Sequence, residues 1–365
     1  MKYKVIVLAG GYATRLRPLT ITKPKPLLPV VGKPLIKWII ENLVKNNVEE
    51  IIMALYHMAN KIIDFLKSDK YIAQFPIRYI VENKPLGDAG AIKYVSHLAS
   101  LESTFVVVYG DVFSNVNLDD VIKFHLSRGN IATMVLTKVN DASRFGFVEI
   151  KNDLIMKIIE KPSKKIPGLV NAGIYVFEPE VLRLIPKGRS KLSIHVLPKL
   201  IEMKQLSGYI HKGLWSDVEE FQDYFRINME LLKKLCKDAC IGDNVRMEGD
   251  VELIPPIYIG SNIVLGTNTI LGPNVIIGSN TKLGNGVRVQ NSILMDGINV
   301  NDYTYISRSI LGSNCYIGKW VRIDEGTIVG DGVSIYDETY IAPHTAILPF
   351  KEISNSIRRE GEVIL

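Results

Sequence analysis

Residues 259–289 read IGSNIVLGTNTILGPNVIIGSNTKLGNGVRV and form the most regular stretch of the chain. An apolar side chain recurs every six positions, with a glycine after each of the first five: Ile259, Leu265, Leu271, Ile277, Leu283, Val289 and Met295. A period of six fits neither an α-helix nor a simple hairpin, whereas each hexapeptide of a coil forms one flat strand and one turn. The stretch therefore predicts a left-handed parallel β-helix with these side chains inside.

The turns of this β-helix are predicted at the third residue after each apolar position. Four asparagines and a glycine stand there: Asn262, Asn268, Asn274, Asn280 and Gly286. These residue types accept the left-handed backbone conformation that other residues resist. The register breaks near residues 296–304 and resumes at Leu311, Ile317 and Ile323. We expect the β-helix domain to comprise residues 236–365.

The preceding residues alternate between short apolar runs and amphipathic stretches. The runs at 5–8, 51–55, 77–81 and 105–109 are typical of buried parallel strands, and residues 34–47 carry an apolar stripe with helical spacing. This alternation predicts an α/β domain of residues 1–235. We expect a doubly wound, mixed but mainly parallel, Rossmann-like sheet that binds its ligand at the carboxyl ends of the strands.

The composition is that of an ordinary globular protein. Among 365 residues, 47% are hydrophobic and 22% charged, and no stretch approaches the roughly 20 apolar residues of a membrane span. The apolar run at residues 5–8 is too short for a signal peptide. Three cysteines cannot build a disulfide framework and fit a reducing compartment. We expect a cytoplasmic protein, with Cys236 and Cys240 one turn apart on a helix and not bound to metal.

The first 40 residues carry positive charge only. No acidic residue precedes Glu41, whereas eight basic residues do: Lys2, Lys4, Arg15, Arg17, Lys23, Lys25, Lys33 and Lys37. Such a block could bind nucleic acid or a small polyanion. The glycines and prolines among these cations favour a fixed pocket for a small polyanion, so we expect no nucleic-acid partner.

Two segments in this block have the residue types of a phosphate site. Leu8, Ala9, Gly10 and Gly11 directly follow the first strand, where backbone N–H groups can face a phosphate, although the spacing is not that of a P-loop. Arg15 adds a fork of donors for phosphoryl oxygens. Further along, Lys25 stands between two prolines that fix its backbone.

Together the two segments resemble the sugar-1-phosphate nucleotidyltransferase family, whose motif is close to L-A-G-G-x-G-T-R-L-x-P-x-T…K-P-L-L-P. The resemblance implies that Arg15 and Lys25 bind the phosphates of the nucleotide and stabilise the transition state. Ala13 stands where the family usually has glycine. Because alanine tolerates a positive φ poorly, we expect the loop to be slightly re-set there.

The resemblance extends to two aspartates. Asp111 stands two residues after the apolar run at 105–109, and Asp217 lies in the stretch GLWSDV at 213–218. By resemblance both carboxylates bind one magnesium ion, which prefers two carboxylates together with phosphates and water. The family commonly continues with G-T-P where Glu219, Glu220 and phenylalanine stand here, so we expect a difference in how the second carboxylate is positioned.

Two further motifs resemble the half of the family's site that binds the sugar phosphate. They are EKP at 160–162 and VNAGIY at 170–175. The resemblance implies that Lys161 binds the sugar's phosphate and that Glu160 and Asn171 hydrogen-bond its hydroxyls. It also implies that Gly146 lets the sugar approach the backbone.

The stretch ENKPLGDAG at 82–90 resembles the family's base-binding loop. Members that use uracil or thymine typically carry glutamine where Glu82 stands, five residues before Gly87. A carboxylate only accepts hydrogen bonds, and guanine offers two adjacent donors, so Glu82 favours GTP. Residues 309–322 and 347–353 resemble the β-helix and the tail of GDP-mannose pyrophosphorylases. The implied reaction is nucleotidyl transfer from GTP to mannose 1-phosphate, releasing pyrophosphate.

Three alternatives stay open. The first is a thymidylyl- or uridylyltransferase acting on glucose 1-phosphate. The second is a catalytically silent subunit that senses a sugar nucleotide, in line with the changed Glu219 and Glu220. The third adds acetyltransferase activity in the β-helix, which needs a catalytic histidine, and His344 is the only histidine after residue 211. We expect the β-helix to mediate a homo-oligomer instead, because its ends are open strand edges.

Overall fold

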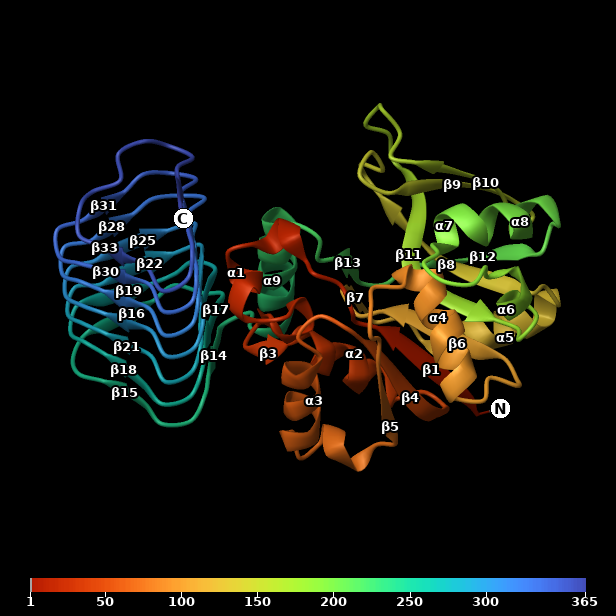
Figure 1. Cartoon of the computed structure of the whole chain (residues 1–365). Coiled ribbons are helices and arrows are strands. Elements are labelled where there is room, and N and C mark those ends of the chain that lie inside the picture. The colour runs from red at the N-terminus through yellow and green to blue at the C-terminus, as the bar shows by residue number, and fades with distance from the viewer. Residues whose placement is uncertain (1) are drawn as a thin grey trace. The chain divides into compact units, whose positions relative to one another are not determined.

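The computed structural model describes residues 2–365, and these form two compact units (Figure 1). The first unit contains the chain up to Tyr12 and then Leu35–Val218. The second contains Ala13–Pro34 and Glu219–Leu365. The short segment Ala13–Pro34 is therefore grouped with the C-terminal part of the chain and not with the residues that flank it in sequence.

A nine-stranded mixed sheet is the centre of the first unit. Its first four strands are mutually parallel, and the remainder contains antiparallel pairs such as β6 with β11 and β11 with β8. The predicted Rossmann-like mixed sheet is thus confirmed. In spatial order the strands are β5 (Ile77–Val81), β4 (Val48–Leu55), β1 (Tyr3–Leu8), β6 (Phe105–Tyr109), β11 (Gly168–Phe177), β8 (Ala132–Val139), β12 (Leu206–His211), β10 (Leu154–Glu160) and β9 (Gly146–Lys151).

Helices lie beside this sheet, and the longer ones each bury one apolar side. In α2, the five buried side chains belong to the apolar stripe predicted from the sequence: Leu35, Ile36, Ile39, Ile40 and Leu43. The helices of the first unit are α2 (Leu35–Leu43), α3 (Ala59–Ser68), η3 (Ile72–Gln74), α4 (Gly87–Leu98), α5 (Leu118–Arg128), α6 (Val181–Leu184), α7 (Leu192–His195) and α8 (Leu197–Glu202). A separate two-stranded ladder pairs β7 (Val112–Ser114) with β13 (Trp215–Asp217).

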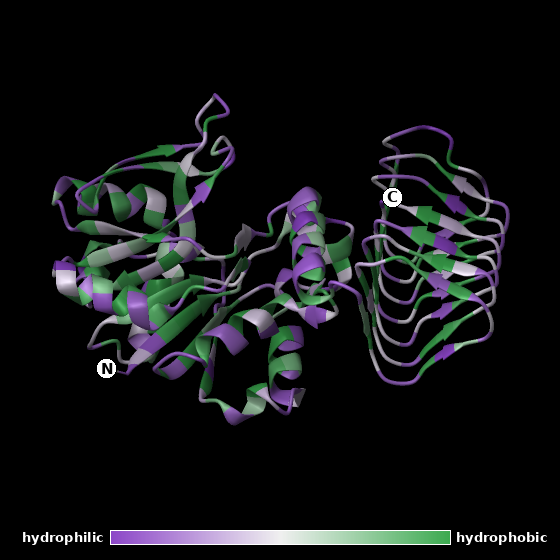
Figure 2. Cartoon of the chain, turned by 180° about the vertical axis from the view of Figure 1, so that it is seen from behind, coloured by the Kyte–Doolittle hydropathy of each residue, from purple (hydrophilic) through white to green (hydrophobic). Residues whose placement is uncertain are grey.

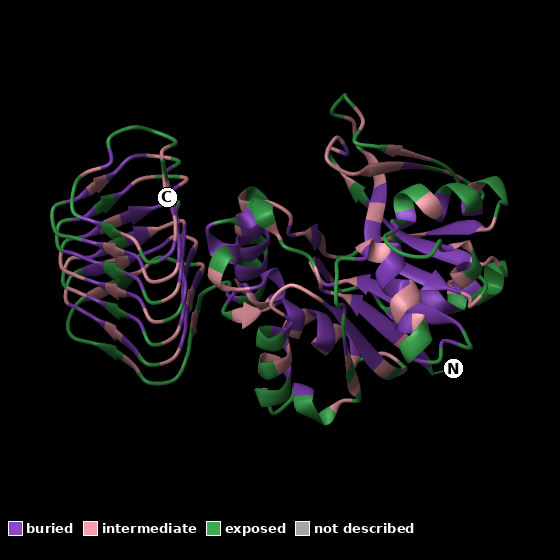
Figure 3. Cartoon of the chain, in the orientation of Figure 1, coloured by how far each residue is buried: buried purple, intermediate pink, exposed green. Residues whose placement is uncertain are grey.

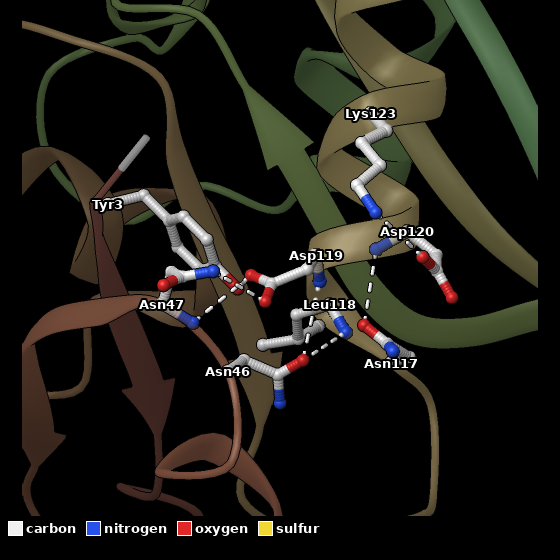
Figure 4. A network of polar contacts seen from close by, with 8 residues as sticks. All are labelled: Tyr3, Asn46, Asn47, Asn117, Leu118, Asp119, Asp120 and Lys123. Atoms are coloured by element: carbon white, nitrogen blue, oxygen red, sulfur yellow. Dashed lines mark hydrogen bonds and ion pairs between the residues drawn. The ribbon is translucent and has the colours of Figure 1, made fainter.

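The start of α5 is anchored by a polar network near the beginning of β1 (Figure 4). Asn117 caps the helix by accepting the N–H of Asp120 at 3.2 Å. Asn46 accepts the N–H groups of the first two helical residues, and Asp119 accepts the hydroxyl of Tyr3 at 2.8 Å. These side chains satisfy helix donors that have no partner within the helix. The network fixes α5 to β1 at the edge of the sheet where β1 begins.

The second unit contains a parallel β-helix of three sheets, with eight, seven and six strands, and the predicted left-handed β-helix is confirmed. The first sheet holds β14 (Ala239–Ile241), β17 (Ile257–Ile259), β20 (Val275–Ile277), β23 (Ser292–Leu294), β26 (Ile310–Leu311), β29 (Ile328–Val329), β32 (Ala346–Ile347) and β34 (Val363–Ile364). The second holds β15 (Val245–Met247), β18 (Ile263–Leu265), β21 (Lys282–Leu283), β24 (Asn299–Val300), β27 (Tyr316–Ile317), β30 (Ser334–Ile335) and β33 (Glu352–Ile353). The third holds β16 (Val251–Leu253), β19 (Thr269–Leu271), β22 (Arg288–Gln290), β25 (Tyr305–Ser307), β28 (Arg322–Ile323) and β31 (Tyr340–Ile341).

The interior of the β-helix is a continuous apolar stack. Figure 2 shows hydrophobic and hydrophilic residues alternating along its coils, and Figure 3 shows the buried positions. All five predicted turn residues have a positive φ between 58° and 64°. Asparagine side chains in successive coils hydrogen-bond one another, for example Asn244 to Asn262 at 2.9 Å. The sequence pattern therefore predicted both the interior positions and the turns.

The expected break in register near residues 296–304 is wrong. Val300 and Ile306 lie in the buried core, so the repeat continues through this stretch. What changes is coil length, because Val275 pairs with Ser292, 17 residues on, whereas Ile257 pairs with Val275 after 18. The shorter coil places Leu294 in the core in place of Met295, whose sulfur lies near Lys23 Nζ.

The rest of the second unit comprises α9 (Phe221–Leu235) and the segment Ala13–Pro34. That segment contains η1 (Thr14–Leu16), α1 (Leu19–Thr22), η2 (Lys25–Leu27), β2 (Pro29–Val30) and β3 (Lys33–Pro34). Asn228 of α9 accepts the N–H of Val31 at 2.8 Å, and the hydroxyl of Tyr224 donates to the carbonyl of Pro29. Helix α9 thus holds one end of the segment.

The cysteines differ from the expectation. Helix α9 ends at Leu235, so Cys236 and Cys240 are not one turn apart on a helix; their Cα atoms lie 5.3 Å apart and they form a disulfide. That separation is within the range a disulfide spans. Cys315 is buried and free, and burial raises the pKa of its thiol to about 12. No helix within residues 2–365 is long and apolar enough to cross a membrane.

Candidate active site

A cavity of about 460 Å³ in the first unit lies at the carboxyl ends of β1, β4 and β6. This is the edge of the sheet at which the α/β pattern predicts a ligand. The cavity is lined by Leu8, Gly10, Gly11 and Tyr12 after β1, by Ala54, by residues 82 and 85–88, by Ala91, and by Tyr109, Asp111 and Arg189. Predicted residues thus meet at one place although they are far apart in sequence.

The two glycines after β1 have different surroundings. A Cβ on Gly10 would lie 3.1 Å from Cβ of Tyr56, which is a tight contact. A Cβ on Gly11 would meet nothing within 4 Å. The backbone at Gly11 is therefore open, so a ligand can approach its N–H group closely. Ala9 is buried and donates its N–H to the carbonyl of Ala54 at 2.9 Å, which fixes the start of the glycine turn to β4.

Glu82 directly follows β5, lines this cavity and is only 8% exposed. Its Oε2 accepts the N–H of Leu86 at 3.0 Å. Burial raises the pKa of this carboxyl above its usual range, because the charged form loses solvation. A carboxylate oxygen has more than one lone pair, so Glu82 can still accept hydrogen bonds from a ligand.

Gly87 begins α4 beside Glu82. Its φ is +76°, and a Cβ there would lie 2.4 Å from the carbonyl oxygen of Ser190. Both facts exclude a side chain, because the left-handed conformation and the backbone contact each disfavour one. Glycine at this position therefore allows the loop that contains Ser190 to close against the start of α4.

The two predicted metal ligands lie next to each other. Asp111 immediately precedes β7, and Asp217 is the last residue of β13, which pairs with β7. The N–H of Val218 donates to the carbonyl of Asp111 at 3.1 Å. In the preceding residues, Trp215 donates its indole N–H to the carbonyl of Ala172 at 2.9 Å, which connects β13 to β11. Residues 2–365 contain no group of three or more histidine, cysteine or acidic side chains suited to a metal ion.

The residues predicted to bind the sugar phosphate lie on β9, β10 and β11 or, for Lys161, directly after β10. Gly146 and Glu160 are paired across β9 and β10, and a Cβ on Gly146 would lie 3.3 Å from Glu160 Oε1. Lys161 has a positive φ of 47° and donates its N–H to the carbonyl of Phe145 at 3.0 Å. The lining of the 460 Å³ cavity does not include Gly146, Glu160, Lys161 or Asn171.

Contacts of Asn171, Tyr175 and Tyr109 connect the residues predicted to bind the sugar to the cavity. Asn171 donates to the hydroxyl of Tyr175 at 2.5 Å and accepts the N–H of Gly173 at 2.9 Å. The ring of Tyr175 lies 6.0 Å from that of Tyr109, whose hydroxyl donates to Asp88 at 2.6 Å. Burial raises the pKa of both tyrosines well above the usual value, so both remain donors at neutral pH.

Arg15 and Lys25 belong to the second unit, whereas the other predicted site residues belong to the first. The guanidinium of Arg15 forms an ion pair with Glu219. Lys25 is 7% exposed and begins η2 between its two prolines. Ala13 has a φ of 49° and a ψ of 44°, the left-handed conformation that alanine tolerates poorly.

The second departure from the family pattern also has a structural explanation. Glu220 is the N-cap of α9 and forms a capping box with Asp223, whose Oδ2 accepts the N–H of Glu220 at 3.0 Å. The two glutamates at 219 and 220 therefore serve the ion pair with Arg15 and the start of α9.

Four cavity residues with polar groups on their side chains were not predicted as site residues: Tyr12, Asp88, Tyr109 and Arg189. Asp88 and Tyr109 lie beside predicted residues, and their pairing requires the tertiary structure. Arg189 lies in the loop between α6 and α7, far along the sequence from the glycines after β1, and it belongs to none of the motifs recognised in the sequence.

An α/β sheet with an open glycine turn and a buried carboxylate at the carboxyl ends of its strands is typical of α/β proteins that bind nucleotides. The model of the family "Nucleotidyl transferase" matches residues 4–234, and that of the "GMPPB C-terminal domain" matches residues 253–364. The chain belongs to the nucleotidyl transferase family. Nucleotidyl transferases of this family generally use a divalent metal ion.

Relatives cover the whole chain. A Debaryomyces hansenii protein named mannose-1-phosphate guanyltransferase is 35% identical over 376 residues, which cover 99% of this chain and 100% of that protein. A Candida albicans protein of the same name is 33% identical over 374 residues, with the same coverage. Among solved structures, HddC from Yersinia pseudotuberculosis complexed with GMP-PN has a TM-score of 0.56 at 27% identity. It covers 63% of this chain and 99% of its own.

Proposed function

We propose that this chain transfers the guanylyl group of GTP to mannose 1-phosphate, which gives GDP-mannose and pyrophosphate. The observation that carries the proposal is the position of Glu82, a buried acceptor inside the cavity of the first unit. The names of the full-length relatives support the same substrate pair.

Glu82 is proposed to select the base. Guanine presents two adjacent donors to a carboxylate, whereas uracil and thymine present one donor flanked by carbonyl acceptors. An acceptor that faces an acceptor in a buried site loses about 1–3 kcal/mol, which is enough for a tenfold preference. Burial raises the pKa of this carboxyl, while the hydrogen bond from the N–H of Leu86 favours its charged, accepting form.

The nucleotide's phosphates are proposed to bind at Gly10 and Gly11, with Arg15 and Lys25 as charge partners. The free space at Gly11 suits a phosphate close to the backbone. The sugar phosphate oxygen attacks the α-phosphorus and pyrophosphate leaves, so the residues mainly position the reactants and offset charge. Arg15 must exchange its partner Glu219 for phosphate in this step.

Asp111 and Asp217 are proposed to hold magnesium. The donor set fits this ion, because two carboxylates on neighbouring backbone segments would leave positions for phosphate oxygens and water, as magnesium prefers. When bound, the ion supplies positive charge near the phosphates. The two aspartates fix where that charge lies, and the tie from Trp215 to β11 holds the strand of Asp217.

The sugar 1-phosphate is proposed to bind along β9, β10 and β11. Lys161 orients the attacking phosphate, Glu160 and Asn171 accept and donate to sugar hydroxyls, and Gly146 leaves room for the ring. The hydrogen bonds of Asn171 with Tyr175 and Gly173 fix the orientation of its amide.

We further propose that residues 1–235 are the catalytic domain and that residues 236–365 associate with other copies of the chain. We also propose that the enzyme works in the cytoplasm, where nucleoside triphosphates are available. The disulfide between Cys236 and Cys240 is unusual for that compartment in most organisms, so measuring the thiol content of protein isolated under acid quench tests this location.

Pyrophosphate release from the purified chain tests the function. Four nucleoside triphosphates are each combined with mannose 1-phosphate and glucose 1-phosphate in the presence of magnesium. We expect the highest kcat/KM for GTP with mannose 1-phosphate. Preference for TTP or UTP with glucose 1-phosphate would identify the alternative transferase. No turnover with any pair, but tight binding of a sugar nucleotide, would identify a silent sensing subunit.

A further inference from the structure

In the second unit, the β-helix contacts the segment that contains Lys25. The hydroxyl of Thr22 donates to Asp331 Oδ2 at 2.7 Å. The ammonium of Lys23 donates to the hydroxyl of Ser313 at 3.0 Å and lies 3.9 Å from the same Asp331 oxygen. Thr22 and Lys23 stand three and two positions before Lys25, and their partners in the β-helix lie at least 290 positions further along the sequence.

Asp331 has two separate tasks in this arrangement. Its Oδ1 accepts the backbone N–H of Ser313 at 2.7 Å. Asp296 and Asp337 accept a backbone N–H of the preceding coil in the same way, at 2.8 and 2.7 Å. The first task is therefore a repeated feature of the β-helix. The second task, performed by Oδ2, is directed at the segment Ala13–Pro34.

The contact is sheltered from solvent. The side chain of Asp331 is 13% exposed and that of Lys23 is 24% exposed. A charged acceptor strengthens the hydrogen bond from Thr22, and partial burial reduces screening of the ion pair by salt. The contact is thus strong enough to restrict the backbone on the N-terminal side of Lys25.

The same segment is held on the other side of Lys25. Asn228 of α9 accepts the N–H of Val31 at 2.8 Å. Gly32 has a φ of +72°, and a Cβ there would lie 2.3 Å from the hydroxyl oxygen of Tyr258 in the β-helix. Lys25 therefore lies between two anchored points, and the prolines on either side of it leave the backbone little freedom.

We propose that Asp331 is a positioning residue for the transfer reaction, which acts through Thr22 and Lys23 to hold Lys25 in place. The inference rests on the role proposed above for Lys25. It gives the β-helix a part in turnover, because the acidic side chain that aligns this segment belongs to one of its coils. A misplacement of about 1 Å in a catalytic group can lower the rate by about 100-fold.

Asp331→Asn separates the two tasks of this residue. Asparagine keeps an oxygen for the N–H of Ser313, but its amide replaces Oδ2 and donates toward Thr22 and Lys23. Asp337→Asn is the matched control, because Asp337 accepts the N–H of Lys319 in the same way, whereas the contacts of Thr22 and Lys23 described above are with Asp331 and Ser313. Circular dichroism and the thermal midpoint establish that both variants are folded.

We expect Asp331→Asn to lower kcat about tenfold or more, with KM for mannose 1-phosphate unchanged, and Asp337→Asn to retain wild-type kcat. Lys23→Met removes the partner charge, so the double variant Asp331→Asn with Lys23→Met should be no slower than Asp331→Asn alone. Wild-type kcat in Asp331→Asn, or an equal loss in both aspartate variants, would overturn the inference.

A second measurement does not depend on turnover. Lys25 is 7% exposed, so it should react slowly with an amine-acylating reagent, and mass spectrometry of peptides reports its labelling rate. We expect faster labelling of Lys25 in Asp331→Asn and no change in Asp337→Asn. If labelling is unchanged in both, Asp331 does not position Lys25. The two aspartate variants can label as expected while a separate Lys25→Ala variant retains wild-type kcat. In that case the proposed role of Lys25 fails and the positioning contact stands.

Discussion

Three residues account for the departures of this protein from its family's motifs: Ala13 near the start of the chain, and Glu219 and Glu220 before α9. Ala13 adopts a left-handed backbone, which costs a residue with a Cβ about 1–2 kcal/mol relative to its preferred conformation. Glu219 forms an ion pair with Arg15, and Glu220 caps α9. Glu219 and Glu220 therefore have defined partners in this structure, whereas Ala13 is a strained position.

At the same scale, turnover should depend on Lys25 and Asp111. We expect Lys25→Ala and Asp111→Asn each to lower kcat by about 100-fold or more, because each removes charge that offsets the transferring phosphoryl group. Initial-rate assays measure kcat, and circular dichroism checks the fold. Lys33→Ala, in the same segment as Lys25, and Asp64→Asn, on the surface of α3, are the controls. Near-wild-type kcat in either site variant would remove that residue from the proposed site.

Glu82 leads to a prediction about pH. Its folded-state pKa is raised by burial above the usual 4.5, so the carboxylate that guanine needs is lost as pH falls through that higher value. We therefore expect KM for GTP to rise as pH falls from neutral through this pKa. The same raised pKa means that stability from this group decreases as pH rises through it.

Glu82→Gln is the test of that prediction. The variant should lose the pH dependence of KM for GTP in this range and should also weaken the preference for GTP over UTP, because glutamine can donate to a uracil carbonyl. Glu102→Gln, on the exposed connection before β6, is the control. An unchanged nucleotide profile and an unchanged pH dependence in Glu82→Gln would contradict the role of Glu82 in base selection.

At the scale of single elements, helices and strands are anchored by side chains at their ends. Helix α5 begins with the cap Asn117 and receives a further acceptor from Asn46, while its own Asp119 accepts the N–H of Asn47 in the network of Figure 4. In the β-helix, turn asparagines and aspartates perform the same task for successive coils. These contacts satisfy backbone donors that would otherwise lack partners.

Asn117→Ala should therefore destabilise the first unit. We expect the free energy of unfolding to fall by about 1 kcal/mol, the usual effect of losing an N-cap acceptor. Urea denaturation followed by circular dichroism measures this change. Ser127→Ala, at the exposed end of the same helix, should change it by less than about 0.5 kcal/mol. Equal effects of the two substitutions would mean that Asn46 alone sustains the start of α5.

At the scale of the whole molecule, the compact units do not follow the order of the chain. The sequence places the boundary between a predicted catalytic domain and the β-helix at residue 235, whereas Ala13–Pro34 and α9 form a compact unit with the β-helix. Contacts such as Val31 with Asn228 and Thr22 with Asp331 explain this grouping. A truncation after residue 235 should remove the partner of Thr22, so the β-helix is best studied within the full chain.

The β-helix should also mediate self-association. Its first coil presents the exposed apolar side chains Ile241 and Met247 on unpaired strand edges, which favour pairing with another chain. We expect light scattering of the full chain to give a multiple of the monomer mass, and Ile241→Lys to shift it toward the monomer on dilution. Leu98→Lys, at an exposed apolar position of α4, is the control and should leave the mass unchanged. A monomeric wild-type chain at every concentration would contradict this assembly.

The sequence by itself determined the features that depend on short-range patterns. The six-residue period predicted the interior and the turns of the β-helix, because each repeat specifies its own strand and its own left-handed turn. Apolar runs predicted the parallel strands, and the glycines after β1 indicated a ligand site at their ends. These are properties of neighbouring residues, so they can be recognised without the fold.

Only the tertiary structure decided which distant residues meet. The shortened coil that buries Leu294 in place of Met295 depends on pairing between whole coils, and a single missing residue in a turn leaves no clear mark in the sequence. The disulfide depends on where α9 ends. The partners of Arg15 and Thr22, and the presence of Arg189 in the cavity, arise because packing brings together segments that no local pattern connects.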